Sequence, residues 1–148
     1  MGLEIEYKYL VKDNSYKTLA FKSYSITQGY LSRERGRTVR VRVRDDKAYI
    51  TIKSARVGLT RHEYEYEIPL ADGQELIKMC PAPVLYKTRY LVEYEGNIWE
   101  VDEFHGDLAG LVTAEIEIPN EEYEFEIPPF VGDDVTEDRR YHNSNLGL

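Results

Sequence analysis

Charged and apolar residues alternate with a period of two along most of the chain. In the stretch LEIEYKYL at 3–10, Glu4, Glu6 and Lys8 alternate with aliphatic or aromatic residues. Successive side chains of a strand point to opposite faces, so this pattern predicts a strand with one charged and one apolar face. Similar stretches predict eight strands in all, at residues 3–11, 25–32, 37–45, 47–54, 61–70, 84–96, 97–104 and 111–119.

Only short stretches favour a helix. Residues 13–22 predict a short helix or a turn. Asp72 is followed three residues later by Glu75, which is the spacing of a capping box, and this predicts a helix that ends near Met79. A further helix is predicted over 120–126, and the rest of the tail is predicted to be irregular.

Short polar turns join several of the predicted strands. Asp45–Asp46 and Gly96–Asn97 each separate two strands, as in a β-hairpin. Successive hairpins favour an antiparallel meander, and closing that meander into a barrel removes its exposed edges. We therefore expect one mainly β (α+β) domain over residues 1–148, an eight-stranded antiparallel closed barrel with short helices packed outside. Such a barrel is about wide enough inside for side chains or one small ligand.

Composition narrows the classes of partner. The formal net charge is −8, which argues against non-specific binding to nucleic acid because that needs a basic surface. The single cysteine, Cys80, cannot form a disulfide within the chain. The charged N-terminus does not fit a signal peptide, and no apolar run reaches the length of a membrane span. We expect a cytoplasmic protein that binds neither membrane nor nucleic acid.

The charged faces of the strands sort by sign. One reading places them in solvent, on an open sheet or a sandwich with ion pairs between strands. The other places them inside a barrel, where carboxylates bind a divalent metal and cations bind a polyanion. Rows of nearly pure sign in at least five strands favour the second reading, because like charges so close repel unless a ligand neutralises them. The acidic rows are Glu4 and Glu6; Glu63, Glu65 and Glu67; and Glu115 and Glu117, and the basic rows are Arg40, Arg42 and Arg44, and Lys87 and Arg89.

The chain resembles the CYTH superfamily, also called the triphosphate tunnel metalloenzymes. EIEYK at 4–8 matches the E-x-E-x-K signature of that family near the N-terminus. The resemblance implies a tunnel with inward charged faces that binds triphosphate substrates with Mg²⁺ or Mn²⁺. It is closest to short bacterial members, for which the implied activity is inorganic triphosphatase. Further matching segments, in the family's order, are QGYL, VRVR, ITIKS, RHEYEYEI, KTRY, WEVDEF, AEIEI and VTEDRRY.

The resemblance also implies roles for individual residues. Tyr30 and Lys87 are the expected catalytic residues, with Tyr30 as a proton acceptor and water activated by the metal as the alternative. Glu63 and Glu65 are left open between metal ligation and ion pairing across the interior. The expected metal ligands are Glu4, Glu6, Glu115, Glu117 and Asp102, and the expected phosphate-binding residues are Lys8, Arg40, Arg42, Lys53, Lys87, Arg89 and Arg140.

Two other functions fit the same charged interior. One is a class IV-type adenylate cyclase, which would also need a pocket for adenine at the tunnel mouth. The other is a non-catalytic module that binds polyphosphate or a nucleotide without turnover. The hypothesis that we carry forward is metal-dependent hydrolysis of a small anionic triphosphate, by a monomer or a homodimer.

Overall fold

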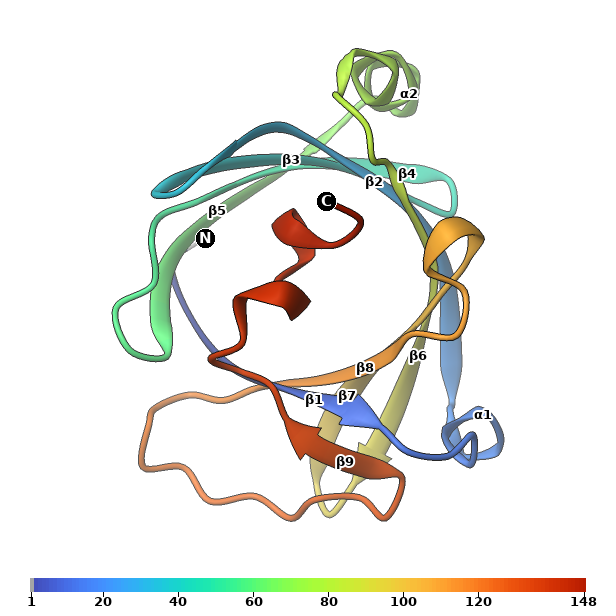
Figure 1. Cartoon of the computed structure of the whole chain (residues 1–148), viewed down its shortest axis with the longest axis vertical. Coiled ribbons are helices and arrows are strands. Elements are labelled where there is room, and N and C mark those ends of the chain that lie inside the picture. Colours follow the sequence, from blue (N-terminus) through green and yellow to red (C-terminus); the bar gives the residue numbers. More distant parts are fainter. Residues whose placement is uncertain (1) are drawn as a thin grey trace.

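The strands form a closed barrel in the computed structural model, which describes residues 2–148 (Figure 1). Each predicted strand is present, and the predicted eight-stranded antiparallel barrel is confirmed. A ninth strand lies outside the closed ring. The strands are β1 (Gly2–Val11), β2 (Lys22–Glu34), β3 (Arg37–Arg44), β4 (Lys47–Lys53), β5 (Thr60–Ile68), β6 (Leu85–Tyr94), β7 (Asn97–Phe104), β8 (Val112–Glu117) and β9 (Val131–Asp134).

The first strand closes the barrel because its two edges have different neighbours. Residues 6–10 pair with residues 113–117 of β8. On the other edge, residues 2–5 pair with residues 60–63 of β5. Beyond Thr60, the first residue of β5, β9 continues that edge, with Asp134 opposite Tyr9. The N-terminal strand therefore joins both ends of the meander.

The turn between β6 and β7 lies one residue earlier than the sequence predicts. Its central residues are Glu95 and Gly96, with φ values of 48° and 81°, and Asn97 already belongs to β7. Positive φ at both central positions is the requirement of the type I′ hairpin turn, whose twist matches that of the strands. Glycine adopts positive φ without strain at the second central position, and Glu95 adopts it at the first.

Two helices, α1 (Tyr16–Leu19) and α2 (Leu70–Met79), lie outside the barrel (Figure 1). The prediction that Asp72 caps α2 is wrong, because α2 starts at Leu70 and Asp72 lies in its first turn. Pro69 ends β5, and the chain turns directly into the helix. Gly73 brings α2 against β4, since a Cβ on Gly73 would lie 2.3 Å from the Cβ of Ala48.

The predicted helix over 120–126 is also wrong, because this segment is irregular and crosses the outer face of the barrel. The Phe125 ring lies 5.5 Å from that of Tyr7 and 5.9 Å from that of Trp99. The Tyr123 hydroxyl donates to Oδ1 of Asn97 at 2.6 Å. An extended backbone lets residues 123 and 125 reach the barrel together, whereas a helix would turn them to different faces.

The C-terminal segment, which was predicted to be irregular, instead contains β9 and short helices. Beyond β9, two 3₁₀ helices, η2 (Arg139–Tyr141) and η3 (Asn143–Asn145), follow. Viewed along the barrel they lie within the ring of strands (Figure 1). Leu146 is buried against Tyr30, Leu85 and Phe104, so apolar contacts hold this segment in the interior. A third 3₁₀ helix, η1 (Gly106–Leu108), follows β7.

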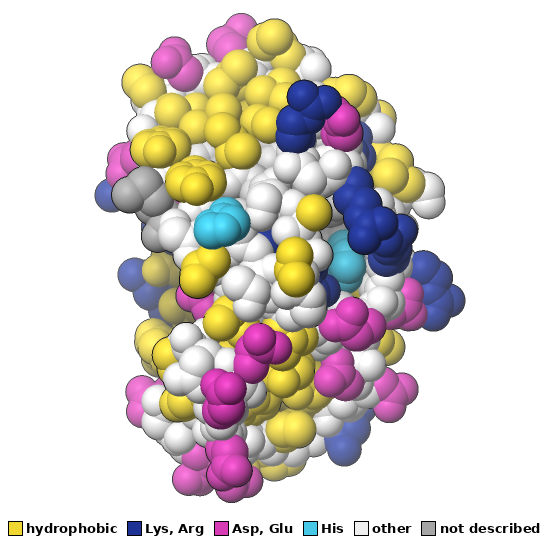
Figure 2. All heavy atoms as spheres, turned by 90° about the vertical axis from the view of Figure 1, so that its left-hand side faces the viewer, with side chains coloured by type: hydrophobic (Ala, Val, Ile, Leu, Met, Phe, Trp, Pro, Cys, Tyr) yellow, Lys and Arg dark blue, Asp and Glu magenta, His cyan; other side chains and the backbone are white. Residues whose placement is uncertain are grey.

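The larger apolar core lies outside the barrel wall. The outward side chains of β1, β6, β7 and β8 pack there against α1 and the segment that leads to β9, with Trp99 and Phe130 fully buried. The outer faces of β4 and β5 are less covered, and Ile52, Tyr64 and Tyr66 are exposed. Figure 2 shows apolar side chains gathered on one part of this side of the molecule, with acidic side chains below them.

Within residues 2–148, no helix combines the length and the apolar character that crossing a bilayer requires.

Candidate active site

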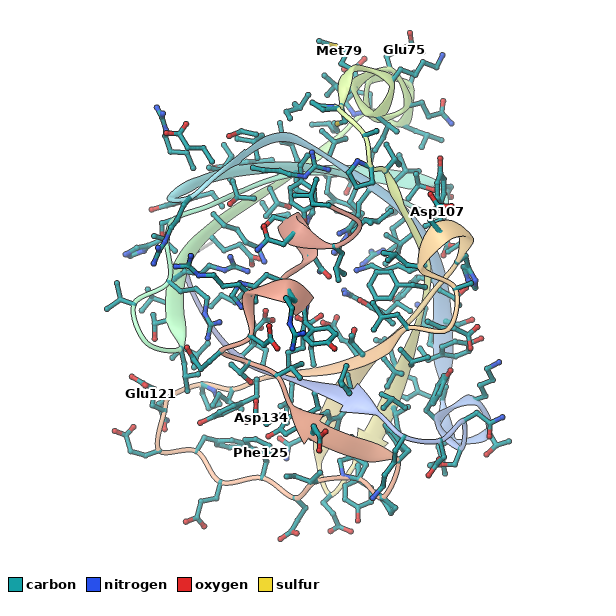
Figure 3. All side chains as sticks on the ribbon, in the orientation of Figure 1. Glu75, Met79, Asp107, Glu121, Phe125 and Asp134 are labelled. Carbon is teal, nitrogen blue, oxygen red and sulfur yellow. The ribbon has the colours of Figure 1, made fainter. Side chains whose placement is uncertain are left out.

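The barrel interior contains a cavity of about 560 Å³ lined mainly by charged side chains. The register of the strands explains this charged lining. Residues paired directly across neighbouring strands share a face of the sheet, and the acidic and basic rows all fall on the inner face. Figure 3 shows side chains from the surrounding strands pointing into the ring, whereas Glu75 and Met79 on α2 project away from it. The cavity is therefore lined mainly by polar groups, and the larger packed core is external.

Three carboxylates meet on one side of the cavity. Oxygen atoms of Glu4, Glu63 and Glu117 all lie within 4.8 Å of one another. These residues come from β1, β5 and β8, which are neighbours because β1 closes the barrel. Carboxylate oxygens are the hard ligands that Mg²⁺ and Mn²⁺ prefer, so this acid cluster fits a divalent cation.

The electrostatics of the acid cluster show incomplete neutralisation by the protein. Burial would raise the pKa of Glu4, but Lys53 and Arg61 outweigh it and hold that pKa at about 2. Burial and the carboxylate of Glu4 raise the pKa of Glu63 and that of Glu117 above the usual value. One acid is thus kept ionised by its cations, while the ionised forms of its two neighbours are less favoured, even though Lys53 also lies 3.3 Å from Glu63.

Glu6 and Glu115 lie next to this cluster. Burial and the carboxylates of Glu115 and Glu4 raise the pKa of Glu6 well above its usual range. Glu115 is also buried, but Lys8 and Arg89 help to hold its pKa at about 2. The acidic side therefore extends from β1 to β8 and includes Glu6, whose ionised form is disfavoured by burial and by its acidic neighbours.

Guanidinium groups gather on β3 and β6. Arg42 is buried, and its Nε and Nη2 atoms donate to Oε1 of Gln28 at 3.1 and 3.0 Å. Burial and the nearby Arg40 and Arg89 lower the pKa of Arg42 to about 9. A phosphate group would offset both effects, because it brings negative charge and oxygen acceptors for the planar guanidinium.

A buried ion-pair group lies beside these guanidinium groups on the inner face, where Asp102 is the register partner of Arg89. The two carboxylate oxygens of Asp102 accept from Nε and Nη2 of Arg89 at 2.8 and 2.9 Å. Lys87 has no exposed side-chain surface, and its Nζ lies 2.8 Å from Oδ2 of Asp102. Burial lowers the pKa of Lys87 to about 7 even beside that carboxylate. Asp102 is thus committed to two cations, and neither it nor Lys87 lines the cavity.

The C-terminal segment forms part of the cavity wall. His142, Asn143 and Ser144 line it. The Nζ of Lys8 donates to the backbone oxygen of Tyr141 at 2.7 Å and is 3.4 Å from Oδ1 of Asn143. A cation of β1 is therefore held by neutral acceptors of this segment.

The structure brings together most of the residues proposed from the sequence. Arg140 lies apart from them: its side chain is 80% exposed and pairs with Asp138 at 2.7 Å. Lys87 and Asp102 are buried beside Arg89 and are not part of the cavity lining. The proposed residues that line the cavity are Glu4, Glu6, Lys8, Tyr30, Arg40, Arg42, Lys53, Arg89, Glu115 and Glu117.

Some residues of the site were not singled out from the sequence. Arg61 donates from Nε to Oε1 of Glu4 at 3.0 Å, and its place two residues before Glu63 was the available signal. Glu63, which was left open, is a member of the acid cluster. Gln28 carries no charge, so sorting charges by strand does not find it. Residues 142–144 follow no pattern that places them inside the barrel.

A closed barrel with facing acidic and basic rows is the architecture implied by the sequence resemblance, and comparison with known proteins agrees. The chain belongs to the CYTH family, because the sequence model of the CYTH domain family matches residues 2–146. Membership of this family implies a divalent metal, and the acid cluster supplies suitable ligands.

Several relatives share nearly the whole length of the chain. The inorganic triphosphatase of Acetivibrio thermocellus is 48% identical, with 99% of this chain and 94% of that protein covered. The inorganic triphosphatase of Nitrosomonas europaea is 34% identical, with 98% and 97% covered. The crystal structure of the inorganic triphosphatase NE1496 has a TM-score of 0.67 at 31% identity, with 96% and 92% covered.

Proposed function

We propose that the protein is a metal-dependent inorganic triphosphatase that hydrolyses tripolyphosphate or a small molecule containing a triphosphate. The observation that carries this proposal is the cavity itself, in which the acid cluster faces buried guanidinium groups. A divalent cation and a polyanion need opposite environments side by side, and this cavity provides both. The inorganic triphosphatases among its relatives support the same activity.

The metal in this proposal is Mg²⁺ or Mn²⁺, held by Glu4, Glu63 and Glu117 with Glu6 and Glu115 beside them. When bound, the ion supplies charge neutralisation at the phosphate oxygens and activation of water. Lys53 and Arg61 already pair with Glu4 and fix the orientation of its carboxylate. The raised pKa values of Glu63 and Glu117 fit a place where a cation replaces protons.

The phosphate chain lies, in this proposal, along the cations of β1, β3 and β6. Arg40, Arg42 and Arg89 bind its oxygens through charge-assisted hydrogen bonds, and Lys8 adds a point charge. Phosphoryl transfer depends mainly on positioning and on stabilising charge, so these fixed cations are the main contribution of the chain to catalysis. Asp102 pairs with Arg89 and fixes the orientation of its guanidinium group.

Tyr30 and Lys87 are the groups that we propose to handle the proton. Tyr30 lines the cavity, so its hydroxyl can face the attacking water. Lys87, whose pKa lies at about 7, is fully buried beside Asp102 and close to Arg42 and Arg89. Arg140 has no place in this proposal because it is exposed and lies outside the cavity lining.

We further propose that the chain acts as one domain in the cytoplasm, as a monomer or a homodimer without nucleic-acid or membrane partners. The net charge of −8 supports the absence of a nucleic-acid partner. Size-exclusion chromatography with light scattering tests the oligomeric state.

A phosphate-release assay tests the function. Purified protein is incubated with tripolyphosphate, ATP or thiamine triphosphate, each with Mg²⁺, with Mn²⁺ or with EDTA. We expect release from tripolyphosphate that needs the cation. No cation-dependent release from any of the three would overturn the proposal, and cyclic AMP as the main product from ATP would replace it with an adenylate cyclase.

A further inference from the structure

Gln28 is a fully buried polar residue at the inner face of β2. Its register partners are Arg42 on β3 and Leu85 on β6. Burying an amide is unfavourable unless its hydrogen-bonding groups find partners. The hydrogen-bonding partners of Gln28 therefore indicate why a polar side chain is buried at this position of β2.

Both ends of the Gln28 amide have a partner in the site. Oε1 accepts two bonds from Arg42, at 3.1 and 3.0 Å, and Nε2 donates to the Tyr30 hydroxyl at 3.4 Å. A guanidinium only donates, so the oxygen of the amide must face Arg42 and its NH₂ group must face Tyr30. One neutral side chain thus connects a buried cation to a tyrosine of the cavity wall.

The partner of Arg42 differs in kind from those of Arg89, Lys53 and Arg61. Asp102 pairs with Arg89, and Glu4 pairs with both Lys53 and Arg61. Those carboxylates orient their cations but also cancel part of the positive charge. Across residues 2–148, Arg42 forms no ion pair with a carboxylate. The amide orients its guanidinium and leaves the charge available to a ligand.

We propose that Gln28 is a positioning residue for triphosphate binding: it orients Arg42 without neutralising it and fixes the Tyr30 hydroxyl at the same time. This inference rests on the proposed function. It follows that a carboxylate at position 28 is harmful even though it is a stronger acceptor for the guanidinium. A purely structural role gives the opposite expectation, because an ion pair in place of the amide would still hold Arg42.

The test compares Gln28→Glu and Gln28→Met in the full chain, with Gln74→Glu on exposed α2 as a control for added charge. The measurements are KM and kcat for tripolyphosphate, calorimetric binding of tripolyphosphate and the thermal midpoint. We expect Gln28→Glu to keep the thermal midpoint but to raise KM and weaken binding by about tenfold or more, the value of one charge-assisted bond. Gln28→Met should weaken binding similarly and also lower kcat, because Tyr30 loses its partner.

Each variant is also made in an Arg42→Ala background. If Gln28 acts through Arg42, the loss of binding caused by Gln28→Glu largely disappears there. Wild-type binding in both single variants, or an undiminished effect in the Arg42→Ala background, would overturn the inference. Gln28→Glu decides the matter even if Gln28→Met does not fold. A wild-type chain that neither binds nor hydrolyses tripolyphosphate would instead refute the proposed function.

Discussion

Individual cavity side chains differ in how completely the protein satisfies their charge. Arg61 and Lys53 both pair with Glu4, which satisfies cation and acid together. Lys8 and Arg42 are instead held by neutral oxygen atoms. Burial and the carboxylate of Glu4 raise the pKa of Glu63. Residues with unbalanced charge have the most to gain from a ligand, so substitutions there should affect function more than stability.

Glu63 and Glu65 give a matched pair on the inner face of β5. Glu63 belongs to the acid cluster, whereas Glu65 accepts from Thr51 at 2.9 Å and lies 3.5 Å from Arg40. We expect Glu63→Gln to reduce cation-dependent phosphate release by roughly 10- to 100-fold, the loss typical when support of a metal site is removed. Glu65→Gln should keep most activity. Rates measured over a titration of Mg²⁺ check this, and equal losses in the two variants would contradict the assignment.

Arg42→Ala tests the basic side. The variant loses a charged donor to phosphate, so we expect binding of tripolyphosphate to weaken by about 1–3 kcal/mol. The effect should appear mainly in KM. Arg37→Ala is the control, because Arg37 is exposed and pairs with nearby Glu34 on the surface. An unchanged KM in Arg42→Ala would show that the phosphate chain does not reach this guanidinium.

At the scale of elements, the strands were predictable because their pattern is local. The alternation in β1 or β3 arises because one face of the strand points inward and the other outward. This alternation can be recognised in each segment by itself, without the rest of the chain. Alternation alone does not say which face is inside. The purity of sign along the rows supplied that information, since repelling like charges need a ligand or an opposite row.

The elements that were predicted wrongly depend on contacts between segments that are distant in the sequence. Residues 120–126 have a helical composition, but Phe125 packs on Tyr7 and Trp99, which the local sequence does not reveal. The C-terminal segment enters the barrel because Leu146 finds an apolar site there. The inner carboxylates were predictable because they follow the local alternation of each strand. The role of Gln28 was not, because it depends on the register of β2 with Arg42 on β3.

Gly73 in α2 gives a prediction at this scale. A Cβ there would lie 2.3 Å from that of Ala48 on β4, so Gly73→Ala must push the helix away from the barrel. We expect a loss of about 1–3 kcal/mol in the free energy of unfolding, despite the higher helix propensity of alanine. Gln74→Ala, at an exposed position, should change it by about 0.5 kcal/mol or less. Urea unfolding measures both, and a stabilised Gly73→Ala would show that α2 is not seated on β4.

For the whole molecule, closure of the barrel and formation of the site are one event. The acid cluster takes Glu4 from β1, Glu63 from β5 and Glu117 from β8. These residues are far apart in the sequence and meet only when β1 pairs with both neighbouring strands. A cation bound by all three therefore favours the closed barrel over the unfolded chain.

Stabilisation by a cation should depend on pH in a defined direction. The pKa values of Glu63 and Glu117 are raised, so these carboxyls hold protons above the pH where unfolded ones have lost them. Protons compete with the cation, and its affinity should rise as pH increases through the raised values. Mg²⁺ or Mn²⁺ at about 100 times its Kd at neutral pH should then add about 2.7 kcal/mol to the free energy of unfolding. The same concentration should add less near pH 5, because the Kd is higher there.

Thermal unfolding with EDTA or with the cation, from about pH 5 to about pH 7.5, measures this increment. Glu65→Gln should keep it, because Glu65 lies outside the acid cluster, whereas Glu63→Gln should lose most of it. Calorimetry in buffers of different ionisation enthalpy should detect release of protons on binding. An increment that is independent of pH, or that survives in Glu63→Gln, would mean that the cation binds elsewhere. Closure of the barrel would then form the cavity without forming the metal site.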